Sequence, residues 1–64
     1  MNNSIHEEYE KTLKKRDEIR EALRKLERED PSDSYTIAVT RDRLAYWEGK
    51  TEGLKFAVEH FGKE

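Results

Sequence analysis

The sequence predicts an all-α fold, an antiparallel two-helix hairpin of the coiled-coil type that dimerises into a four-helix assembly. Apolar residues recur at alternating steps of three and four in both halves of the chain, which is the spacing of one helix face. The halves are separated by the only proline, Pro31, within a polar run at residues 30–34. We therefore expect one helical-hairpin domain over residues 1–64.

The first helix is expected to span about residues 4–29. Ser4 is a good N-cap residue, and Glu7 three positions later completes a capping box. A regular stripe with coiled-coil spacing follows, made of Ile5, Tyr9, Thr12, Arg16, Ile19, Leu23 and Leu26. Glutamate and lysine pairs at i,i+4, such as Glu7 with Lys11, favour helicity on the solvated face.

Pro31 disfavours the α conformation at Asp30, so the first helix should end by about Glu29. Two starts for the second helix compete. Asp30 would cap a helix that has Pro31 at its first position, whereas Ser34 would cap a helix that begins at Tyr35. We favour the later start, which gives a second helix over about residues 35–61 with Gly62 just beyond it as a C-terminal cap.

The two stripes align when paired residue numbers sum to 66 or 67, as an antiparallel hairpin requires. Large apolar residues then fall in every layer but one, and Trp47 is placed deep in the seam between the helices. The exception is Arg16 opposite Thr51. In this polar layer the arginine either reaches Glu52 or an acidic group of a partner, or extends its guanidinium into water.

The second helix has apolar or small residues on two opposite faces, although a helix with one neighbour needs only one. The inner stripe is Ile37, Thr40, Leu44, Trp47, Thr51, Leu54, Val58 and Phe61. About 160° away around the helix axis lies an outer stripe of Val39, Tyr46, Gly49, Gly53, Phe56 and His60.

Glycine inside a helix costs roughly 1 kcal/mol relative to alanine, and two glycines in one turn are explained if another backbone approaches closely. Tyr46 and Phe56 lie one turn to either side of this pair, as rims of a shallow notch. The predicted partner-binding residues are Val39, Tyr46, Gly49, Gly53 and Phe56.

Composition narrows the function classes. The absence of cysteine excludes disulfides and thiolate metal sites, and the short apolar runs predict neither a membrane span nor a signal peptide, which favours a cytoplasmic protein. His6 and His60 are expected near each other at the open end of the hairpin, but two histidines without supporting residues predict no metal site. No catalytic triad or phosphate-binding loop is present, so we expect neither a cofactor nor enzymatic activity.

One feature of the first helix favours a nucleic-acid alternative. A ridge of four arginines at i,i+4 spacing, Arg16, Arg20, Arg24 and Arg28, would meet an RNA backbone, although acidic residues are interleaved with it. The predicted layout is similar in size and hairpin arrangement to the plasmid RNA-binding protein Rop, whose dimer is a four-helix bundle; this resemblance covers layout and no motif.

We expect a small non-enzymatic interaction protein, a regulator or adaptor whose partners are itself, as a homodimer, and another protein. The formal net charge of −2, with both signs spread along the chain, gives no bulk attraction to nucleic acid or to a membrane. The alternative is a dimer that binds structured RNA through the arginine ridge.

Overall fold

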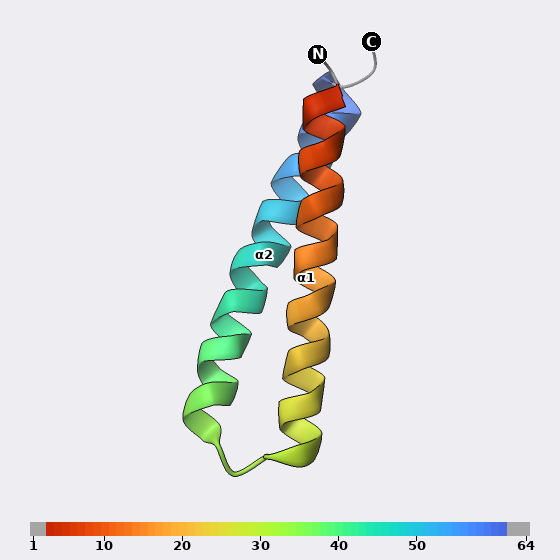
Figure 1. The fold of residues 1–64 in the computed structure, drawn as a ribbon. Helices are drawn as coiled ribbons and strands as arrows, with labels where there is room; N and C mark the ends of the chain where they lie inside the picture. The colour runs from red at the N-terminus through yellow and green to blue at the C-terminus, as the bar shows by residue number, and fades with distance from the viewer. Residues whose placement is uncertain (1–2, 62–64) are drawn as a thin grey trace.

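The computed structural model describes residues 3–61, which form two helices that pack against each other in antiparallel fashion (Figure 1). α1 spans Asn3–Glu29 and α2 spans Ser34–Phe61. The predicted helical hairpin is therefore confirmed, and each helix begins one residue earlier than the sequence indicated. The molecule is a rod of 49 × 14 × 12 Å whose radius of gyration, 14.5 Å, exceeds the value of about 11 Å typical of a compact domain of this length.

The connection between the helices is a tight turn over residues 30–33. The amide of Asp30 donates to the carbonyl of Leu26 at 2.8 Å, which closes the last turn of α1. The amide of Asp33 then donates to the carbonyl of Asp30 at 3.1 Å across Pro31. Proline at the second position of such a turn is favourable because its fixed φ matches the turn geometry.

The N-cap of α2 is Asp33, so both caps considered from the sequence, Asp30 and Ser34, were wrong. The Asp33 carboxylate accepts a hydrogen bond from the amide of Thr36 at 3.2 Å, and its carbonyl accepts one from the amide of Ile37 at 3.1 Å. An N-cap side chain typically accepts a hydrogen bond from the amide two or three residues later, and Asp33 does so with Thr36. The turn across Pro31 leaves Asp33, and not its neighbours, in that position.

The seam between the helices is most deeply buried at two threonines. Thr12 and Thr51 are 1% and 2% exposed, whereas the buried aliphatic residues of residues 3–61 are only Leu23 and Ile37. Each threonine hydroxyl donates to the carbonyl four residues earlier in its own helix, at 2.7 Å, with Glu8 and Trp47 as the acceptors. The hydroxyls are thereby satisfied without a partner across the seam, and these short side chains allow the helices to approach closely.

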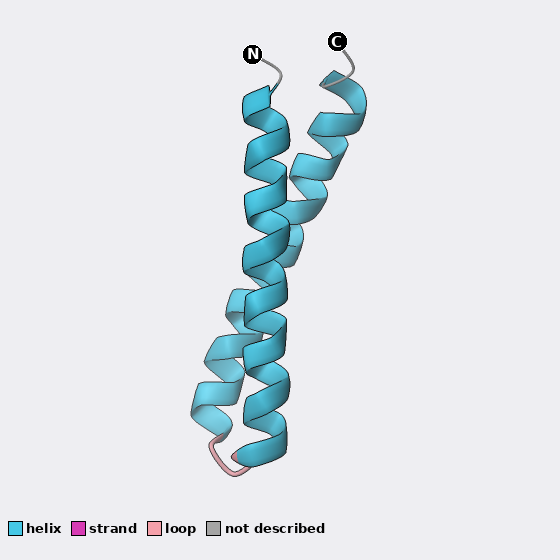
Figure 2. Ribbon diagram, turned by 45° about the vertical axis from the view of Figure 1, so that its right-hand side comes forward, coloured by secondary structure: helices cyan, strands magenta, loops and turns pink. Residues whose placement is uncertain are grey.

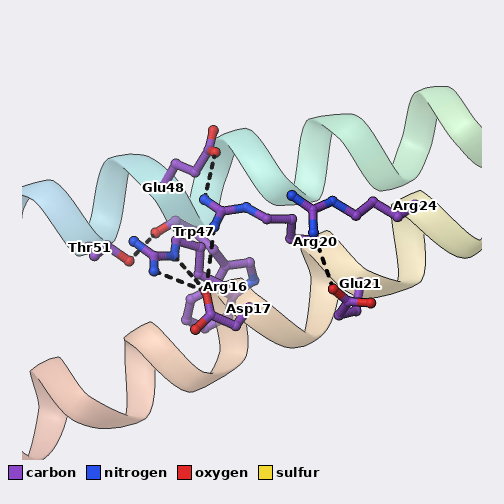
Figure 3. Close-up of polar contacts among 8 residues, drawn as sticks. All are labelled: Arg16, Asp17, Arg20, Glu21, Arg24, Trp47, Glu48 and Thr51. Atoms are coloured by element: carbon purple, nitrogen blue, oxygen red, sulfur yellow. Dashed lines mark hydrogen bonds and ion pairs between the residues drawn. The ribbon is translucent and has the colours of Figure 1, made fainter.

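Three expectations about the seam need correction. Trp47 is half-buried rather than deep. Phe61 is 65% exposed, because the end of α2 diverges from the start of α1 (Figure 2). Arg16 does not pair with Glu52; its partly exposed guanidinium forms an ion pair at 2.9 Å with Asp17, its neighbour in α1 (Figure 3).

Ion pairs flank the seam on its solvent-exposed edges. Arg20 pairs with Glu48 at 3.5 Å and Arg41 with Glu27 at 2.9 Å, each one residue from the partner that the predicted alignment gives. Lys50 pairs with Glu8 at 4.0 Å and departs from that alignment by about two helical turns. All six side chains are substantially exposed, so these pairs fix orientation more than they add stability.

Candidate protein–protein interface

The exposed large hydrophobic side chains of the described chain all belong to α2. They are Tyr35, Val39, Tyr46, Phe56 and Phe61. α1 instead packs its apolar stripe, which is partly or fully buried, against α2 and presents charged residues to solvent. The two helices therefore differ: α1 has one apolar face, whereas α2 has an inner face that packs in the hairpin and an outer face that is exposed among residues 3–61.

The five residues predicted to bind a partner are all exposed on α2. Tyr46 and Phe56 are 62% and 57% exposed, and Val39 is 40% exposed at the edge of the face. The Tyr46 and Trp47 rings are nearly perpendicular at a centroid distance of 5.3 Å, and the centroids of the Phe56 ring and the His60 imidazole lie 4.1 Å apart. These contacts within α2 hold both aromatic rings at the surface of the rod.

The two glycines of this face are not required by the packing of the hairpin. A Cβ atom built on Gly49 or on Gly53 meets nothing within 4 Å, and neither glycine has a positive φ. Alanine would therefore fit at either position with a better helix propensity. The cost of both glycines is unexplained by the isolated hairpin, and it is explained if a second backbone approaches here.

The arginine ridge of α1 is neutralised by neighbouring carboxylates. Arg16 and Arg20 both contact Asp17, and Arg20 also contacts Glu48 across the seam (Figure 3). Further along the ridge Arg24 pairs with Glu21 at 3.3 Å. Arg28 lies 4.0 Å from Glu29. A phosphate backbone would have to displace these carboxylates, so the arrangement gives no support to the RNA alternative.

Sequence reasoning missed Asp42, which lies on the outer face one turn before Tyr46. Its side chain is exposed, and within residues 3–61 its carboxylate forms no ion pair. The outer stripe was selected for apolar and small residues, so an aspartate was left out of it. The four-residue step from Asp42 to Tyr46 was the signal that could have found it.

The described part of the chain was also searched for metal sites, pockets and membrane-spanning helices. Residues 3–61 hold no cluster of three or more histidine, cysteine or acidic side chains arranged to bind a metal. A hollow on α1 is open to solvent and lined by the exposed Glu7, Glu10, Lys11 and Lys14. Neither described helix combines the length and the apolarity needed to cross a bilayer.

The outer face of α2 is thus the best-defined candidate site. Comparison of the chain with models of protein families, with curated proteins and with solved structures gave no match.

Proposed function

We propose that this chain is a small non-enzymatic interaction protein, a regulator or adaptor, which acts through protein–protein contacts as a self-associating helical hairpin. The observation that carries the proposal is the position of the exposed large hydrophobic residues, all of which lie on α2 within the described chain. Scattered single apolar residues would need no explanation, but Tyr46 and Phe56 flank two glycines at helical spacing on one face.

The thin core of the hairpin supports the same proposal. Only Leu23 and Ile37 are buried among the large apolar residues at positions 3–61, and the chain has no disulfide to add stability. Chains of this size commonly depend on disulfides, metals or oligomerisation. Covering the outer face of α2 with a partner would supply the apolar burial that the hairpin lacks.

Sedimentation equilibrium tests self-association directly. The wild-type chain should form a dimer over about 5–500 µM, because interfaces of standard area reach micromolar or higher affinity. Gly53→Leu should shift the chain towards monomer, since its side chain would block the close approach of a second helix. Ala22→Leu, on the exposed side of α1, adds the same side chain elsewhere and should leave the dimer intact.

Two results would contradict the proposal. A wild-type chain that stays monomeric over the whole concentration range does not self-associate. A dimer whose mass is unchanged by Gly53→Leu uses another surface. A second protein partner would be identified by a pull-down from the native host with mass spectrometry.

A further inference from the structure

The exposed side of α2 carries a symmetric series of six residues. They follow one another at steps of four, three, four, three and four, and all are exposed: Asp42, Tyr46, Gly49, Gly53, Phe56 and His60. From either end, the series gives a polar group, an aromatic ring and a glycine before it reaches its centre. Alternating steps of four and three form one seam on a helix.

We propose that α2 packs antiparallel against α2 of a second copy of this chain, with the centre of contact between Gly49 and Gly53. This inference rests on the self-association proposed above and specifies its surface and direction. In an antiparallel pair, Gly49 shares a layer with the partner's Gly53, and Tyr46 shares one with the partner's Phe56. At each end of the contact, Asp42 lies in the same layer as the partner's His60.

Each of these layers joins compatible groups. Glycine against glycine allows the backbones to approach, and the aromatic rings on either side fill the space next to them. Asp42 has no ion pair within residues 3–61, and His60 is held on the same face by its ring contact with Phe56 at 4.1 Å. A carboxylate accepts a hydrogen bond from an imidazole N–H in either protonation state of the histidine.

A parallel pair would lose this complementarity. Asp42 would face the partner's Asp42, and His60 would face the partner's His60. Two carboxylates in one layer repel each other, and two histidines in the other layer gain no carboxylate acceptor. The charges on the face therefore select the antiparallel direction, whereas the apolar residues alone would permit both.

Self-association through this face also sets the arrangement of the four helices. Because the inner and outer faces of α2 lie about 160° apart, the four helices would form a row in which the two copies of α2 are central. A square bundle would need contact faces about 90° apart on each helix.

Engineered thiols test the direction of packing, because the chain has no cysteine of its own. Tyr46→Cys and Phe56→Cys leave Asp42 and His60 in place. In an antiparallel pair the two copies of position 46 lie about 15 Å apart along the helix axes, so Tyr46→Cys alone should not cross-link. Phe56→Cys alone should behave in the same way. An equal mixture of Tyr46→Cys and Phe56→Cys chains should form a disulfide-linked dimer under mild oxidation.

The outcomes separate this inference from the proposed function. A wild-type chain that is monomeric in sedimentation contradicts both. A dimeric chain in which Tyr46→Cys cross-links to itself contradicts only the antiparallel direction. A dimeric chain in which neither the single variants nor their mixture cross-links contradicts the proposed surface.

A charge exchange provides an independent measurement on the same pair. Asp42→Lys and His60→Glu should each lower the association constant about tenfold, since Asp42→Lys removes the carboxylate acceptor opposite each copy of His60 and His60→Glu places a second carboxylate opposite each copy of Asp42. The two substitutions combined in one chain should restore association, whereas Glu18→Lys on α1 controls for the change of net charge in Asp42→Lys. Failure of the double variant to recover would overturn the pairing of Asp42 with His60.

Discussion

Replacing both outer-face glycines by alanine should affect the folding of the hairpin and its self-association in opposite directions. At Gly49 and at Gly53 a new Cβ atom meets nothing within 4 Å, and both residues lie inside α2. The added methyl groups therefore create no clash in the isolated hairpin. In the proposed dimer, the same methyl groups lie where the second backbone makes its closest approach.

The expected magnitude follows from helix propensity. Each substitution removes a cost of about 0.8–1.0 kcal/mol, so Gly49→Ala with Gly53→Ala should raise the free energy of unfolding of the monomer by about 2 kcal/mol. For a chain of this length, that change corresponds to a melting temperature about 8–16 °C higher. Ala22→Gly, on the exposed side of α1, should lose about 0.8–1.0 kcal/mol and leave self-association unchanged.

The assay is urea unfolding followed by far-ultraviolet circular dichroism at two protein concentrations, combined with sedimentation equilibrium. At low concentration the double alanine variant should be more stable than the wild type. At high concentration the wild type should gain stability from dimer formation, and the variant should gain less. Equal gains for both chains, with equal dimer mass, would show that no backbone approaches the glycines and would refute the reasoning.

Three further results are expected. Asp33→Ala should lower the free energy of unfolding by about 1 kcal/mol in urea titrations, whereas Ser34→Ala should change it by less than about 0.5 kcal/mol; the reverse order would mean that Ser34 is the cap. Trp47→Ala should cost about 2–3 kcal/mol in the same titration, less than the 3–5 kcal/mol typical of a fully buried aromatic residue, and a larger loss would mean that the indole is deeper than half-buried. Structured RNA should bind weakly in fluorescence anisotropy at about 150 mM salt because carboxylates neutralise the arginine ridge; tight, salt-sensitive binding that Arg24→Glu abolishes would contradict this expectation.

The helices could be predicted from the sequence because the signals that define them are local. The three- and four-residue spacing of apolar residues and the interruption of the helix by Pro31 both involve near neighbours in the chain. Both helices therefore fall within one residue of the expected bounds. The N-cap of α2 was harder to predict from the sequence. The hydrogen bonds of the turn place Asp33, rather than Asp30 or Ser34, at the cap position, and these bonds depend on how the chain reverses at Pro31.

Part of the candidate site could also be predicted from the sequence, because the signals that define it are local. The exposure of Tyr46, Gly49, Gly53 and Phe56 followed from their angular position on a helix whose opposite face is buried. Asp42 was missed because its charge removed it from an apolar stripe, although its spacing places it on the same face.

The sequence by itself determined that two helices form, where the turn between them lies and which sides of each are apolar, because these properties depend on residues at most four positions apart. Only the tertiary structure decided how deeply each seam residue is buried. Thr12 and Thr51 are almost completely covered, whereas Trp47 is half-buried and Phe61 is exposed. Burial of a seam residue depends on how the two helices cross in space, because side chains near the crossing are covered by the other helix and side chains at the diverging end of α2 are not (Figure 2).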